Sequence, residues 1–255
     1  MGILESIQKG FSLARKSLSL VFLLFVFGFI FNMINLALTP KTPEAGAPSP
    51  VLIIAGVIFI FLTIFFQAGS MGYVRDKIKT GTATLSNFIS SGGKYYLRLL
   101  VLGLMVSLII GVFVLFAALA VAFLKGNLVA LGILLAILFA ALGIYFVVML
   151  FLSPYVAVVD DKTVKESIRL SVRLVKKNIL PLLGMSALLV LIGFAIGLVL
   201  GAMLAGLSYL IKKEMISQTI FALLSSLVNA YLGITVTAAF INFYLAIADR
   251  NNTPA

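Results

Sequence analysis

The sequence contains no cysteine and no histidine. Without cysteine, the chain can form no disulfide and offers no thiol nucleophile. Without histidine, it has no imidazole that could act as a general base or bind zinc. There is also no glycine-rich loop of the kind that binds nucleotide phosphates. We therefore predict that the protein is not an enzyme and that it holds no cofactor.

Charge is the next scarce property, because only 11% of the 255 residues are charged whereas 62% are hydrophobic. A soluble domain has about a quarter charged residues. The charges leave six uncharged stretches, at residues 17–40, 45–74, 99–124, 126–159, 178–211 and 215–248. Each stretch exceeds the roughly 20 residues that a helix needs to cross the hydrocarbon core. Since a helix satisfies its own backbone hydrogen bonds in lipid, the sequence predicts an all-α integral membrane protein with six transmembrane helices.

The predicted spans form a single membrane domain that covers residues 1–255. We place them near residues 17–38, 51–73, 98–123, 128–153, 180–210 and 219–248. Short linkers join the two spans of each pair: a proline-rich segment at 39–50, a tight turn at 125–127 and a basic segment around 212–213. An even number of spans places both termini on the same side of the membrane.

The basic residues predict the orientation. Of the 19 lysines and arginines, 15 lie in residues 1–16, 75–98, 160–177 and 249–255, and 4 lie in the three short linkers. Cytoplasmic segments carry the excess of lysine and arginine. We therefore expect a multi-pass protein of the cell membrane with cytoplasmic N- and C-termini. Because the positive charge is divided among segments next to the membrane, we expect no nucleic-acid partner.

One of the inner segments has the pattern of an amphipathic helix. Its charges recur at intervals of four and three residues, at Lys162, Glu166, Arg169, Arg173 and Lys176. The opposite face would carry Val164, Ile168, Val172, Val175 and Ile179. Such a helix lies in the membrane interface with its apolar face in lipid. The N-terminal residues show a similar stripe, at Ile3, Ile7, Phe11, Ala14 and Leu18.

These segments favour an internal repeat. Residues 5–7 and 166–168 are both Glu-Ser-Ile, and a lysine stands at the start of each odd-numbered span, at Lys16, Lys94 and Lys177. We predict three repeats, each an interfacial helix followed by a helical hairpin. The alternative is that any amphipathic helix before a span would produce the same pattern.

The basic inner face predicts a partner, namely anionic lipid headgroups. The candidate headgroup residues are Lys16, Lys94, Arg98, Arg169, Arg173, Lys176 and Lys177. The same residues would also set the topology, and the two roles are compatible. The main functional hypothesis is a non-enzymatic protein that organises lipid, or a membrane or cytoplasmic partner protein, through these helices. An oligomer is compatible with it.

The spans contain few polar residues and no ionisable residue near a span centre. This argues against a proton-coupled pump, a voltage sensor or an ion exchanger. Gln67, Asn229 and Asn242 could line a polar path, which would favour a permease or channel for an uncharged or lipid-like solute. The alternative is that these amides only join helices by hydrogen bonds.

Small residues recur every four positions in the fifth span, at Gly193, Gly197, Gly201 and Ala205. Small residues at this spacing let two helix backbones approach closely in lipid. We predict that this stripe packs against another helix, either within the chain or in a second copy.

Asp160 and Asp161 are adjacent acids at the inner end of the fourth span. Paired carboxylates can bind a metal or transfer protons. Only Glu166 lies near them in sequence, so we predict no metal site. We instead predict that Asp161 caps the helix that begins near Lys162.

Short motifs carry a family resemblance, at residues 72–75, 93–96, 153–161, 164–171 and 174–178. They resemble a broad group of six-span bacterial and archaeal proteins, which includes the membrane domain attached to some glycerophosphoryl diester phosphodiesterases. The resemblance implies an all-α six-span domain and no activity, because catalysis in those phosphodiesterases belongs to a separate soluble domain. The sequence ends at Ala255, soon after the sixth span, so we expect no such domain here.

Overall fold

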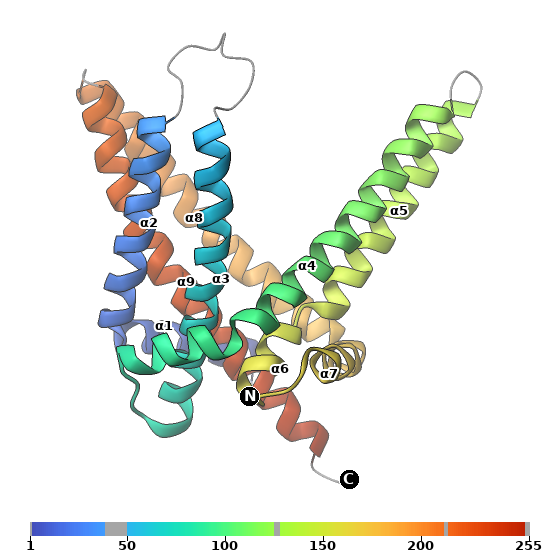
Figure 1. Ribbon diagram of the computed structural model, residues 1–255, viewed down its shortest axis with the longest axis horizontal. Helices are drawn as coiled ribbons and strands as arrows, with labels where there is room; N and C mark the ends of the chain where they lie inside the picture. Colours follow the sequence, from blue (N-terminus) through green and yellow to red (C-terminus); the bar gives the residue numbers. More distant parts are fainter. Residues whose placement is uncertain (1, 39–49, 125–127, 212–213, 253–255) are drawn as a thin grey trace. The chain divides into compact units, whose positions relative to one another are not determined.

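The computed structural model describes residues 2–38, 50–124, 128–211 and 214–252 (Figure 1). The helices in these ranges are α1 (Ile3–Arg15), α2 (Leu18–Leu38), α3 (Pro50–Thr80), α4 (Leu85–Phe123), α5 (Val129–Leu150), α6 (Ser153–Val159), α7 (Val164–Lys177), α8 (Ile179–Leu210) and α9 (Glu214–Asn252). The predicted linkers at 39–49, 125–127 and 212–213 lie outside the described residues.

The described residues include six segments that are long and apolar enough to cross a membrane. They are Leu18–Leu38, Pro50–Thr80, Leu85–Phe123, Val129–Val159, Ile179–Tyr209 and Met215–Asp249. The predicted fold class, an all-α protein with six membrane-spanning helices, is therefore confirmed.

The second and third spans are longer than predicted at their polar ends. α3 continues to Thr80, because nothing in the sequence interrupts its helical hydrogen bonding before Gly81. α4 begins at Leu85, well before the predicted start of the third span. Gly81 has φ +78°, the left-handed conformation that favours glycine after a helix. Thr84 then starts α4: its hydroxyl accepts from the Asn87 backbone N–H, and the side-chain amide oxygen of Asn87 accepts from the Thr84 N–H at 3.0 Å.

The chain forms two compact units, which are described separately. Unit 1 comprises Met1–Lys94 and Leu180–Ala255, and unit 2 comprises Tyr95–Ile179. In unit 1, α9 is the central helix, since α1, α2 and α3 all pack on it. Its turns beyond Gly233 are deeply buried, with Ile234, Ala238, Ala239, Ile241 and Tyr244 almost or entirely inaccessible.

α1 is the amphipathic helix predicted at the N-terminus, and it packs on α9 near the start of α2. Its buried face consists of Ser6, Ile7, Gly10 and Ala14. A Cβ at Gly10 would lie 2.5 Å from the Thr235 carbonyl oxygen and 3.1 Å from the Ala239 Cβ, so only glycine allows this approach. α1 is thus fixed to the spans and does not merely lie in lipid. We call the part of unit 1 where α1 packs on α9 the α1 end of unit 1.

In unit 2, the fourth span is interrupted near its polar end. α5 ends at Leu150 and α6 begins at Ser153, because Pro154 has no N–H to donate and its ring would clash with the preceding turn. α7 then folds back and packs on both α5 and α6. The buried α7 side chains are Ser167, Ser171, Leu174 and Val175.

The three predicted repeat units differ in local structure. α1 and α7 are separate helices, each followed by a span after a short break. The middle counterpart, residues 85–94, forms the first turns of α4 and continues into the span. The repeat itself stays a prediction.

Candidate functional site

α7 presents a row of basic side chains. Arg169, Arg173 and Lys176 are exposed, and none of them makes an ion pair within the part of the chain that the structure describes. The half-buried Ile168 and Val172 lie beside the row. Because the buried face of α7 packs on α5 and α6, these helices fix the position of the basic row within unit 2. Exposed cations next to apolar side chains suit an anionic membrane surface.

The start of α7 is fixed by a capping box. The Thr163 hydroxyl accepts from the Glu166 backbone N–H, while the Glu166 carboxylate accepts from the Thr163 N–H at 3.1 Å and from its hydroxyl at 2.9 Å. These bonds, first the backbone and then the hydroxyl bond, lower the pKa of the Glu166 carboxyl below its ordinary value of 4.5. The helix cap is therefore Thr163, and the prediction that Asp161 caps the helix is wrong.

Asp161 has a different role. Its carboxylate accepts a hydrogen bond from the Arg98 guanidinium at 2.6 Å, and Arg98 also donates to the Lys162 carbonyl oxygen at 3.2 Å. Asp161 has φ +54° and lies two residues before the cap residue Thr163. No group of three acidic side chains that could hold a metal ion occurs among the described residues.

The other predicted headgroup residues have varied surroundings. Lys16 ends α1, is exposed, and lines a hollow of about 280 Å³ together with Lys9, Lys77 and Asn242. Lys94 and Lys177 are exposed and also interact with other residues. Arg98 is half-buried and bound to Asp161, so its charge is already matched. The hollow at the α1 end is thus a second basic site.

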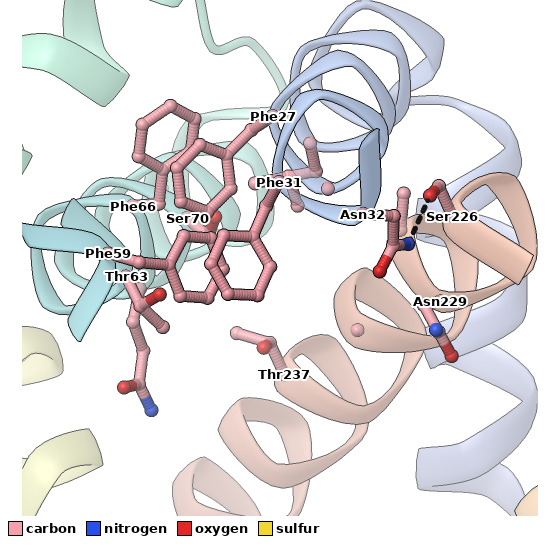
Figure 2. Close-up of a pocket in the computed structure, with 15 residues that line it drawn as sticks. Phe27, Phe31, Asn32, Phe59, Thr63, Phe66, Ser70, Ser226, Asn229 and Thr237 are labelled. Atoms are coloured by element: carbon pink, nitrogen blue, oxygen red, sulfur yellow. Dashed lines mark hydrogen bonds between the residues drawn. The ribbon is translucent and has the colours of Figure 1, made fainter. Parts of the chain in front are cut away.

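A cavity of about 440 Å³ lies in unit 1 between α2, α3 and α9 (Figure 2). One wall consists of the phenyl rings of Phe27, Phe31, Phe59 and Phe66, which stack on one another. Figure 2 shows these rings together, with the side chains of Asn32, Ser226, Asn229 and Thr237 around the rest of the cavity. The cavity therefore has an aromatic side and a polar side.

Some of the polar side chains that line the cavity have hydrogen-bond partners and others do not. The Asn32 amide donates to the Ser226 hydroxyl at 2.8 Å, which in turn donates to the Ala222 carbonyl oxygen. The amides of Gln67 and Asn229 make no hydrogen bond to another residue in the described ranges. Asn242, the third residue of the predicted polar path, lies apart from them in the hollow at the α1 end, where its amide donates to the Ala238 carbonyl oxygen.

The aromatic wall was not predicted from the sequence. Phe27 and Phe31 are four residues apart on α2, and Phe59 and Phe66 are seven apart on α3. Each pair therefore lies on one helix face. The spacing could have indicated such a wall, but phenylalanine is common on lipid-facing surfaces, so the spacing alone does not identify a cavity.

The glycine stripe of α8 is mostly exposed. A Cβ built at Gly193, Gly197 or Gly201 meets no atom within 4 Å. These glycines make no close helix contact within the described chain, so the predicted packing stays a prediction.

The comparisons with known proteins name no activity. No curated protein and no solved structure matches the chain. A family model described as a domain of unknown function, DUF7847, matches residues 1–247. Since this range covers nearly the whole chain, the chain belongs to the DUF7847 family.

Proposed function

We propose that the protein is a non-enzymatic membrane protein that binds and organises anionic lipid at the cytoplasmic surface of the cell membrane. The observation that carries this proposal is the basic row of α7, in which Arg169, Arg173 and Lys176 are exposed without ion-pair partners in the described chain. In the proposed orientation, both termini and the basic row face the cytoplasm.

The magnitude of the expected effect is sufficient for selective binding. A lysine or arginine near an anionic surface contributes about 1 kcal/mol. Three such residues would contribute about 3 kcal/mol, which corresponds to roughly a hundredfold preference for anionic over zwitterionic lipid. This attraction would weaken as salt is added, since exposed charges are screened.

The α1 end supports the same function. Lys9 of α1, Lys16 just after α1 and Lys77 of α3 line one hollow, although Lys9 is also paired with Glu5 at 3.0 Å. A lipid phosphate would neutralise the remaining charge. We propose lipid as the principal partner, with a membrane or cytoplasmic protein partner as the alternative.

Native mass spectrometry of the protein released from nanodiscs of mixed phosphatidylglycerol and phosphatidylcholine tests this proposal. The variant Arg169→Gln/Arg173→Gln/Lys176→Gln should retain much less phosphatidylglycerol than the natural protein. Arg169→Lys/Arg173→Lys keeps the charges and should retain it. Equal retention by all three proteins would overturn the proposal.

A second candidate function is a permease for an uncharged or lipid-like solute. The observation that favours it is the cavity that joins Gln67 and Asn229 at membrane depth. Transport would also need a route from this cavity to both surfaces. Solute flux into proteoliposomes, measured for the natural protein and for Gln67→Leu/Asn229→Leu, tests it. Flux no faster than in protein-free liposomes would exclude it.

Kinship with the membrane domain of glycerophosphoryl diester phosphodiesterases stays a prediction. It would agree with a protein that contacts phospholipids without transforming them.

A further inference from the structure

We propose that the cavity between α2, α3 and α9 binds a neutral lipid-like molecule with a hydroxyl or carbonyl head and an apolar body. The proposal deepens the second candidate function by naming the ligand class, and it rests on the same cavity. It is tested by binding alone, so its failure can be told apart from the failure of a transport role.

The first reason is a set of polar groups without partners. Ser70 is only 6% exposed, and its hydroxyl lines the cavity with no hydrogen-bond partner among the described residues. The Gln67 and Asn229 amides, on the same cavity, also have no partner in the described part of the chain. At hydrocarbon depth no bulk water replaces a missing partner. A ligand head that can both donate and accept would satisfy these groups.

The depth of the cavity can be estimated along α3. Its lining residues run from Phe59 to Ser70, which corresponds to about 17 Å at a rise of about 1.5 Å per residue. Ser70 lies about 8 Å from Arg75 on the same scale. The cavity therefore occupies the middle of the span, and not the headgroup region.

The second reason concerns charge. The described lining residues include amides, hydroxyls and apolar groups but no ionisable side chain. The nearest charges along α3, Arg75 and Asp76, pair with each other at 2.7 Å. A charged ligand head at this depth would lose its hydration without gaining a counter-charge. The cavity thus favours a neutral head.

The third reason is the aromatic wall. Phe27, Phe31, Phe59 and Phe66 form an apolar surface, with Thr63 and Ser70 of α3 beside it and Asn229 of α9 across the cavity (Figure 2). The cavity volume of about 440 Å³ lies in the usual range of small-molecule sites, about 300–1,000 Å³. One molecule with a polar head and an apolar body would give hydrogen bonds to the polar groups and cover the phenyl rings. Water would leave the apolar surface of the phenyl rings exposed to water.

Access to the cavity is lateral. Thr63, Gln67, Asn229 and Gly233 line it and are also exposed. Because they lie within spans, a molecule dissolved in the bilayer can reach the cavity without crossing the headgroup region. This property again matches a lipid-like ligand.

Photolabelling of the full chain in nanodiscs tests the proposal. The probe is hexadecanol with a diazirine in its chain, and the labelled peptides are identified by mass spectrometry. The charged comparison is hexadecyl sulfate with the same diazirine. We expect saturable labelling of α2, α3 and α9 by the alcohol, which unlabelled hexadecanol displaces, and no saturable labelling there by the sulfate.

Two variants and two matched controls make the test specific. Gly233→Leu should fill the cavity, since a Cβ there meets no atom within 4 Å. Gln67→Leu/Asn229→Leu should weaken probe binding about tenfold by removing the amides. Gly111→Leu, at another exposed helical glycine with open space, and Thr219→Val, at an exposed α9 hydroxyl bonded to Met215, should bind normally.

The outcomes separate clearly. Saturable alcohol labelling that is lost in both cavity variants and kept in both controls would support the proposal. Unsaturable labelling spread over all spans would overturn it. Equal saturable labelling by the sulfate would also overturn it, because the site would then accept charge. A variant that fails to fold would be recognised by aggregation in size-exclusion chromatography, and the natural protein's competition curve would then decide the question.

Discussion

The Ser171 hydroxyl donates a hydrogen bond to the Met149 carbonyl oxygen, 2.8 Å away, and so joins the middle of α7 to the end of α5. The bond is buried. It lies where the fourth span is interrupted, since Pro154 cannot continue the helical hydrogen bonding. The bond therefore attaches α7 to the interrupted span and helps to hold the basic row of α7 in place.

Replacing this hydroxyl should loosen α7. Ser171→Ala leaves the Met149 carbonyl without that partner, and we expect a loss of about 1 kcal/mol in stability. The apparent melting temperature in detergent measures this change. Ser225→Ala is the matched control, because within the described residues its hydroxyl bonds to Ala222 of its own helix, at 3.2 Å, and to no other helix. Equal melting temperatures for Ser171→Ala and the natural protein would show that packing alone holds α7.

The capping box should make the first turn of α7 sensitive to acid. The pKa of Glu166 is lower in the folded protein than its ordinary value of 4.5, because Thr163 donates two hydrogen bonds to its carboxylate. A depressed pKa contributes stability that is present above 4.5 and lost as the pH falls through the folded value. Amide exchange over Val164–Ser167, corrected for intrinsic rates, should therefore speed up below 4.5.

The conservative variant separates the carboxylate from other acid effects. Glu166→Gln cannot titrate, so its first turn should exchange with little dependence on pH in that range. If amide exchange in the natural protein and in Glu166→Gln depended on pH in the same way, the Glu166 carboxylate would not be the group that stabilises this turn.

The membrane spans were predictable because they depend on local composition. Long uncharged stretches specify spans whatever they pack against, and the six predicted stretches correspond to the six observed segments. The ends of the spans depend on interactions that composition does not reveal. Gly81 ends α3, and Pro154 interrupts the fourth span after Leu150.

The cavity was only partly predictable, since it depends on which helices meet. Gln67 and Asn229 are far apart in sequence, and only the packing of α2 and α3 on α9 makes them line one cavity. Asn242 has the same side chain on the same helix as Asn229, yet it lies near Lys16 at the α1 end. The residue type identified the three amides as candidates, but which of them lie close together depends on the tertiary structure.

The contact between α1 and α9 should not tolerate a side chain at Gly10. In Gly10→Val, the added atoms would overlap the Thr235 carbonyl oxygen, so α1 would have to move away from α9. We expect a destabilisation of about 2 kcal/mol or more and faster proteolysis near residue 10. Gly193→Ala, with no atom within 4 Å of the new Cβ, should be neutral or slightly stabilising. Equal stability of the two variants would contradict the close contact.

The pair of Arg98 and Asp161 provides a final prediction, in which backbone conformation outweighs charge. The two side chains are 30% and 48% exposed, so the ion pair should contribute at most about 1 kcal/mol. Asp161 also has φ +54°, a conformation that asparagine tolerates and β-branched residues do not. Asp161→Asn should therefore lower the melting temperature slightly, and Asp161→Val should lower it considerably more. Arg98→Gln, which removes the charge from the other partner, should resemble Asp161→Asn. If Asp161→Asn lowered the melting temperature as much as Asp161→Val, the loss of the charge would outweigh the backbone conformation, which would contradict this prediction.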